Sequence, residues 1–150
     1  MEQPRHLGVR VRILSQTIRQ AIDRKLTALD LTGQQSFVLR YLSDHLDEAV
    51  YAKDIEKRFG LTHPTVSGIL QRLEAKGFLV FEQNAPDRRC KRLRMTPKAE
   101  ECQKEIARHI QTIERTLVAG MTPEEENLFL ALLERASTNL NEEMQKEENA

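Results

Sequence analysis

The sequence predicts a mainly α-helical protein of the α+β class, a winged helix-turn-helix with long N- and C-terminal dimerisation helices. Apolar residues recur at three- and four-residue steps over most of the 150 residues, which is typical of amphipathic helices. A Gly-Leu-Thr turn at residues 60–62 separates two short helical segments. Strand-like alternation occurs in 78–95, where two short segments flank turn-forming residues.

The length and composition predict one folded domain over residues 1–150, with a core large enough to be stable alone. Hydrophobic residues make up 39% of the chain and charged residues 31%, which excludes a disordered chain. No apolar run approaches the roughly 20 residues of a membrane span, and the N-terminus lacks the apolar segment of a signal peptide. We therefore expect a cytoplasmic protein without contact to a membrane.

The formal net charge is zero, but the charges are unevenly distributed. Residues 61–98 hold eight Lys or Arg against three Asp or Glu, a net charge of +5. Residues 99–150 hold five against twelve, a net charge of −7. A basic middle segment beside an acidic tail indicates a local binding surface for phosphate groups.

The first helix is expected over about residues 7–30 because apolar side chains recur along one side of it. Thr32 and Gln35 then form the capping-box pattern of a second helix. The polar connection 44–50 could hold a short edge strand near Val50 and Tyr51. The expected apolar positions are Leu14, Ile18, Ala21, Ile22, Leu26 and Leu29 in the first helix, and Phe37, Val38, Tyr41 and Leu42 in the second.

Residues 52–76 carry the pattern of a helix-turn-helix within the winged helix-turn-helix expected at about 31–98. Gly60 follows a short helix and suits the left-handed conformation of a helix C-cap. Thr62 is expected to cap the next helix, and Pro64 falls in its first turn, where no helical partner is lost. The expected core positions are Ile55, Phe59, Val66, Ile69, Leu70 and Leu73.

A basic hairpin, the wing, is predicted directly after this helix-turn-helix. Its strands are 78–81 and the alternating segment around Leu93 and Met95, joined by turn residues at 84–87. Thr-Pro pairs at residues 96–97 and 122–123 start two further helices, expected over about 97–142, with fraying beyond. The terminal helices carry more apolar surface than a winged helix needs to cover, and we therefore expect a homodimer.

A helix able to enter a major groove, followed by a cationic hairpin, indicates binding to double-stranded DNA. The hydroxyl groups of Thr62, Thr65 and Ser67 suit phosphate oxygens near a helix N-terminus. Long polar side chains further along can reach base edges. The candidate contacts in the second helix are Thr62, His63, Pro64, Thr65, Ser67, Gly68, Gln71 and Arg72.

Gly68 lies within this helix although glycine costs about 1 kcal/mol of helix propensity relative to alanine. Two interpretations stay open: the missing side chain permits close approach of the backbone to the duplex, or the residue is a tolerated imperfection.

In the wing, Arg89 is expected to enter a minor groove, because narrow A·T stretches attract a guanidinium group. Asp87 would hold Arg89 through a bidentate ion pair. Further cations would neutralise phosphates. The candidate contacts of the wing are Asp87, Arg88, Arg89, Lys91 and Arg92, with Arg94 beside them.

The order of the elements, the Gly-Leu-Thr-x-x-Thr-Val-Ser turn and the Asp-x-Arg wing resemble the MarR (multiple antibiotic resistance regulator) family over about residues 7–140. Met95 stands where the family usually has Leu, and Gly68 where a larger polar residue is common. The resemblance implies a homodimer whose terminal helices interlock, bound to palindromic promoter DNA and often released by a small ligand. A repressor of transcription is the expected role.

Other interpretations remain. An enzyme is not expected, since the sequence lacks a nucleophile-base pair, a phosphate-binding glycine loop and a metal motif; neither a catalytic residue nor a cofactor is predicted. A winged-helix module for protein or RNA would not need a basic wing. Neighbouring cations would make Cys90 reactive and could support a redox switch, whereas Cys102 is expected to be an ordinary packing or surface residue. His45 and His109 could share a zinc ion, although a solvated loop is the simpler interpretation, and no metal site is predicted.

An effector pocket is expected between the first helix, the second helix and the helix after the wing. Four arginines near the first helix could meet an anionic effector, although each is more simply part of a solvated basic face: Arg10, Arg12, Arg19 and Arg24.

Overall fold

A computed structural model describes residues 6–83 and 90–149 of the chain. The chain divides into two compact units, residues 1–113 and 114–150. Within the described residues, none of the helices combines the length and the apolar character that crossing a bilayer requires.

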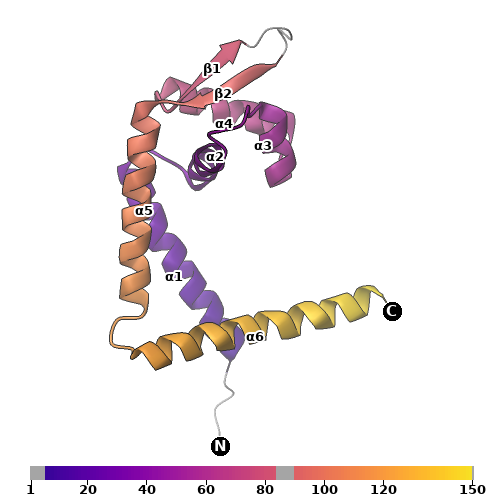
Figure 1. Cartoon of the computed structure of the whole chain (residues 1–150). Helices are drawn as coiled ribbons and strands as arrows, with labels where there is room; N and C mark the ends of the chain where they lie inside the picture. The colour runs from indigo at the N-terminus through magenta and orange to yellow at the C-terminus, as the bar shows by residue number, and fades with distance from the viewer. Residues whose placement is uncertain (1–5, 84–89, 150) are drawn as a thin grey trace, which may run out of the picture. The chain divides into compact units, whose positions relative to one another are not determined.

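The first unit contains the winged helix-turn-helix, and the hairpin lies at one end of this unit (Figure 1). α5 begins in this unit and ends in the second. The elements follow one another as α1 (Leu7–Ala28), α2 (Gly33–Asp44), α3 (Ala52–Phe59), α4 (His63–Ala75), β1 (Leu79–Gln83), β2 (Lys91–Met95) and α5 (Pro97–Leu117). This order confirms the predicted fold.

The helix boundaries follow the predicted capping residues, with one difference in detail. The Gln35 backbone N–H donates to Thr32 Oγ1, and the Thr32 N–H donates to Gln35 Oε1, both at 3.2 Å. Gly60 ends α3 in the left-handed conformation, with φ of 62°. Thr62 occupies the N-cap of α4, but its hydroxyl lies 2.9 Å from the Thr65 hydroxyl instead of accepting from the backbone. The prediction that the Thr62 side chain caps α4 is therefore wrong, because the Thr62 hydroxyl is paired with the Thr65 hydroxyl and not with a backbone N–H group.

β1 and β2 form an antiparallel pair in which Phe81 lies opposite Leu93. Leu93 also pairs with Val50 across an isolated bridge, where its backbone N–H donates to the Val50 carbonyl oxygen at 2.8 Å. The short edge strand expected near Val50 is confirmed in this form. The bridge ties the wing to the connection between α2 and α3.

The apolar core of the first unit joins all its elements. Ile55, Val66, Leu70 and Leu73 are buried as predicted, and residues from α2, the hairpin and α5 complete the cluster. Phe37 was expected on the buried side of α2, but 63% of it is exposed. The prediction was wrong at Phe37, because Leu39, two positions further along α2, turns inward in its place.

The second unit consists of the end of α5 and α6 (Pro123–Glu148). α6 starts with the predicted capping box, in which Thr122 Oγ1 accepts from the Glu125 N–H at 3.2 Å. The helix continues to Glu148, beyond the end expected near residue 142. Strong helix formers fill this last stretch, and Lys146 approaches Glu143 at 3.6 Å one turn away.

Candidate nucleic-acid interface

One groove gathers the side chains of α4 that point away from the core. It encloses about 760 Å³ between α4, the start of α3 and the hairpin. His63, Ser67 and Gln71 line it at successive turns of α4, and Lys91 lines it from β2. The groove therefore unites four of the predicted site residues. Its remaining walls are formed by Tyr51, Ala52, Lys53, Asp54, Leu70, Glu74, Phe81 and Cys90.

The start of α4 presents a cluster of exposed polar groups. Thr62, Pro64 and Thr65 are exposed and lie outside the groove lining. The Thr62 and Thr65 hydroxyls bond each other at 2.9 Å, which uses one of their two protons and leaves the other to be donated outward. Hydroxyls and free backbone N–H groups at a helix N-terminus are the donors that a phosphate oxygen requires.

His63 is tied to the preceding helix. Its Nδ1 lies 2.6 Å from Glu56 Oε1, and the contact spans the turn between α3 and α4. The imidazole remains largely exposed while the Glu56 carboxylate is mostly covered. The second ring nitrogen, Nε2, is thus the one left for an external partner.

Gly68 lies in the middle of the exposed face of α4 with open space beside it. A Cβ atom at this position would meet no heavy atom within 4 Å. Packing inside the protein therefore does not require glycine here.

Arg72 lies apart from the groove that holds the other long side chains of α4. It lines a second cleft, of about 980 Å³, whose walls come from α1, α2, α4 and α5. Gln71, its neighbour in sequence, faces the groove and lies 3.5 Å from Ser67 Oγ. The structure thus brings His63, Ser67 and Gln71 together and separates Arg72 from them.

Only part of the predicted wing site falls within the described residues. Asp87, Arg88 and Arg89 lie outside them. Lys91 is exposed, with its Nζ 5.9 Å from the centre of the Phe81 ring. Arg92 is half-buried, and its Nη2 lies 3.5 Å from the Glu48 carbonyl oxygen.

Arg94 is paired within the hairpin, since its Nη1 lies 2.9 Å from Glu82 Oε1. Lys91 lies over the Phe81 ring and lines the groove. Arg94 therefore joins the two strands of the hairpin through Glu82, whereas Arg92 joins the hairpin to the connection between α2 and α3.

Sequence reasoning did not include Lys53, which is exposed at the start of α3 and lines the groove. Asp54 beside it accepts from the Tyr51 backbone N–H at 2.8 Å and so caps the helix. The missed signal was a cation in the first turn of the helix that precedes the Gly-Leu-Thr turn.

The 980 Å³ cleft lies where an effector pocket was predicted. Ile18, Ile22, Phe37, Ile69, Ile106 and Ile110 supply apolar walls. Of the four arginines expected to meet an effector, Arg19 lines the cleft, whereas Arg10, Arg12 and Arg24 do not. Arg72 and Lys76 add two cations from α4.

The remaining candidates have ordinary structural surroundings. His45 Nδ1 lies 2.7 Å from the Tyr41 carbonyl oxygen, and its ring stacks on Tyr41 at 4.1 Å between centroids. No group of three metal-binding side chains occurs among the described residues. Cys90 is half-buried, whereas Cys102 is buried in the core. Burial raises the pKa of the Cys102 thiol, and nearby Glu105 acts in the same direction.

A helix-turn-helix whose second helix is followed by a two-stranded wing defines the class of winged-helix proteins. The model of the MarR family matches residues 29–89. The chain belongs to the MarR family, and it is a DNA-binding transcriptional regulator.

Solved structures of this family agree with the assignment. The chain is 30% identical to Staphylococcus aureus MepR in a MepR–DNA complex, over 86% of this chain and 96% of that chain, with a TM-score of 0.75. It is 28% identical to MepR described as a transcription regulator of the S. aureus multidrug efflux pump MepA, over 89% and 97%, with a TM-score of 0.81. The transcription regulator MarR from Oenococcus oeni PSU-1 is 28% identical, over 88% and 98%, with a TM-score of 0.60.

Proposed function

We propose that the protein is a homodimeric repressor that binds an inverted repeat in promoter DNA and is released by a small ligand. In this proposal α4 enters the major groove and the wing reaches the adjacent minor groove. The protein acts in the cytoplasm and carries out no catalysis.

The observation that carries this proposal is the groove between α4 and the hairpin. His63, Ser67 and Gln71 face the same space as Lys91, although they come from different elements. A surface with one row of polar side chains on a helix and a cation beside it suits base edges flanked by a phosphate backbone. Thr62 and Thr65 extend it at the helix N-terminus.

The apolar surface of the terminal helices supports the homodimer. Leu128, Leu132 and Leu140 are exposed on α6, and Leu7 and Val11 are exposed on α1. Single exposed leucines are common on monomers, but a stripe at helical spacing along one element indicates a partner. In the proposed domain arrangement, residues 7–30 and 97–142 form this interface and residues 31–98 bind DNA.

The cleft lined by α1, α2, α4 and α5 supports release by a ligand. It joins apolar walls with the cations of Arg19 and Arg72 and the carboxylate of Asp23, which suits an amphipathic molecule that carries a charged group. Because α4 contributes to the lining, a bound ligand contacts the same helix that we propose to read DNA.

Selection of duplexes from a random DNA pool by the purified protein at near-physiological salt tests the proposal. Enrichment of an inverted repeat, with half-sites about one helical turn apart, is the expected result. Failure to enrich any sequence, with a folded dimer and a salt-independent interaction, would favour a winged-helix module for protein or RNA.

The contribution of the wing is tested with Arg89→Ala. We expect at least tenfold weaker binding to the selected duplex, with an unchanged melting temperature, because a guanidinium group in a narrow minor groove is lost. Arg108→Ala is the matched control, since Arg108 is exposed on α5 outside the groove. Equal affinities of the two variants would refute the role of Arg89.

A further inference from the structure

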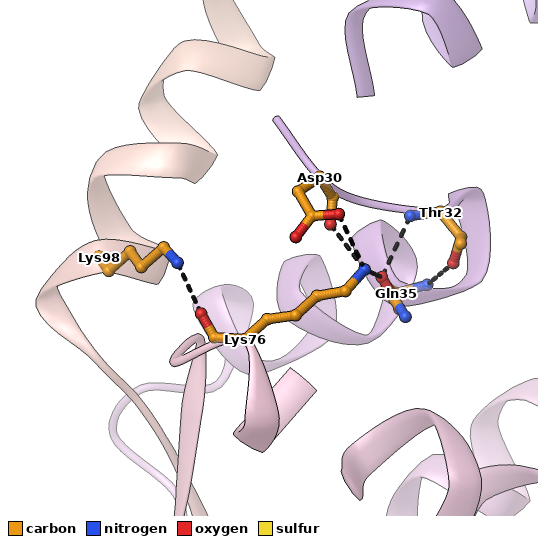
Figure 2. A network of polar contacts seen from close by, with 5 residues as sticks. All are labelled: Asp30, Thr32, Gln35, Lys76 and Lys98. Atoms are coloured by element: carbon orange, nitrogen blue, oxygen red, sulfur yellow. Dashed lines mark hydrogen bonds and ion pairs between the residues drawn. The ribbon is translucent and has the colours of Figure 1, made fainter. Parts of the chain in front are cut away.

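Lys76 joins the end of α4 to the turn between α1 and α2. It is the C-cap residue of α4, and its side chain extends toward residues 30–35, as Figure 2 shows. Its Nζ donates to the Asp30 carbonyl oxygen at 2.8 Å and to Gln35 Oε1 at 3.1 Å. The same Nζ lies 3.5 Å from the Asp30 carboxylate.

These contacts use the full hydrogen-bonding capacity of the groups involved. A lysine ammonium has three donors, and three oxygen atoms surround this one. Gln35 Oε1 accepts from both Lys76 Nζ and the Thr32 backbone N–H, which occupies its two lone pairs. Gln35 is only 2% exposed and is the one buried polar side chain among residues 6–83 and 90–149. A buried amide of this kind has few alternative partners, so removal of the Lys76 ammonium group would lower the stability of the fold.

The backbone at the same end of α4 is tied to α5. Lys98 Nζ donates to the Lys76 carbonyl oxygen at 2.6 Å, a bond that is also drawn in Figure 2. Thr96 Oγ1 donates to the Gly77 carbonyl oxygen, again at 2.6 Å. The Lys76 side chain thus faces the turn that follows α1 and the start of α2, while its carbonyl group faces α5.

The opposite end of α4 is held differently. There His63 Nδ1 contacts Glu56 of α3, which belongs to the same helix-turn-helix. The apolar contacts of α4 resist separation of the helices and still allow small changes in its direction, because the hydrophobic effect is not itself directional. Hydrogen bonds with defined geometry at one end of a helix do fix a direction.

We propose that Lys76 is a positioning residue that fixes the direction of α4 relative to α1 and α5. In a dimer joined through the terminal helices, this direction sets the spacing at which the two α4 helices meet DNA. The inference rests on the proposed homodimer on an inverted repeat, and it adds the residue that sets which half-site spacing is accepted.

Lys76→Met tests this role, since methionine keeps the apolar stem and removes the ammonium donors. Lys104→Met is the matched control, because Lys104 is exposed on α5 and its loss changes the net charge equally. Each protein is titrated with a duplex that holds a single half-site, with the selected inverted repeat, and with repeats one base pair shorter and longer. Dissociation constants are measured at one salt concentration.

The wild type and Lys104→Met are expected to prefer the selected spacing at least tenfold over either altered spacing. For Lys76→Met we expect this preference to fall to less than threefold, with half-site affinity within about twofold of the wild type. A merely structural residue would weaken half-site and full-site binding together. Gln35→Met removes the shared acceptor without a change of charge, and it is expected to relax the spacing preference in the same direction.

Retention of the tenfold spacing preference by a folded Lys76→Met protein would overturn the inference, as would equal losses on half-site and full-site. If Lys76→Met lowers the melting temperature so far that it is unfolded, the Gln35→Met result decides by the same criteria. A wild-type protein that selects no inverted repeat would instead refute the proposed function, and this inference with it. The two failures are thereby distinguished.

Discussion

The winged-helix part and α6 have similar apolar periodicity but opposite burial. Val38, Ile55 and Leu73, each from a different helix of the winged-helix part, are completely buried within one chain. No residue of α6 is buried, and Leu128 is 58% exposed. The first region therefore completes its own core, whereas α6 has an exposed apolar face. The comparison indicates that the two regions depend differently on a partner.

The largest expected effect is the loss of the dimer on substitution of the α6 stripe. Leu128→Glu combined with Leu132→Glu places two charges on one face of α6, where 58% and 48% of the native side chains are exposed. Buried charges without partners are costly, and two copies of each would meet in a dimer. We expect a monomer in sedimentation equilibrium and a loss of about 10²–10⁴ in affinity for the inverted repeat, because bivalent binding is lost.

Asn127→Glu combined with Thr138→Glu controls for the added charge. Both residues are exposed and lie on the opposite side of α6 by helical periodicity. This control should remain dimeric with nearly unchanged DNA affinity. A Leu128→Glu and Leu132→Glu protein that is still dimeric would place the interface elsewhere.

The next effect concerns the core of the winged-helix part. Leu73→Ala removes a completely buried side chain of α4, and we expect a loss of about 2–5 kcal/mol in the free energy of unfolding. Urea denaturation at several protein concentrations measures it. Leu140→Ala is the counterpart in α6, where 68% of the side chain is exposed. If Leu140→Ala lowers the free energy of unfolding as much as Leu73→Ala at every protein concentration, the two regions do not differ in their dependence on a partner.

Local sequence patterns predicted most of the secondary structure because the responsible interactions are local. The capping boxes at Thr32 and Thr122 and the left-handed Gly60 each depend on residues at most four positions away. Periodicity was less exact at Phe37 and Leu39. Both are apolar and two positions apart in α2, and only tertiary packing decides which of them turns inward.

The site was harder to predict, because contacts with residues distant in sequence decide which groove or cleft each side chain lines. Gln71 and Arg72 are adjacent, yet one lines the groove and the other lines the cleft. Lys76 was counted only as a positive charge, whereas it lies hydrogen-bonded to Asp30 and Gln35, which are more than forty positions away. A single sequence gives no means of finding such a pairing.

Gly68→Ala is expected to give a smaller effect. Whether it weakens DNA binding distinguishes the two interpretations of a glycine at this position. The position has open space around it, so alanine should stabilise α4 by about 1 kcal/mol. If the duplex approaches the backbone closely there, DNA affinity falls several-fold although the protein becomes more stable. If glycine is a tolerated imperfection, affinity is unchanged. Thermal denaturation and titration with the selected duplex measure both quantities.

The smallest expected effect concerns the two cysteines, which belong to different surroundings. The thiolate is the form that reacts with iodoacetamide, and burial raises the pKa of the Cys102 thiol, so less of it is reactive at any given pH. Half-buried Cys90 should therefore be modified first in the native protein at pH 8, as peptide mass spectrometry would show.

Cys90→Ser isolates the role of that thiol in DNA binding. Cys90 lines the groove beside Lys91, so an oxidised or alkylated side chain would occupy space that we assign to the duplex. We expect the serine variant to bind DNA within twofold of the wild type and to be insensitive to peroxide. If peroxide weakens DNA binding of the wild type and not of Cys90→Ser, the thiol acts as a redox switch at the wing. Equal affinities of the wild type before and after peroxide treatment would leave Cys90 as an ordinary groove residue.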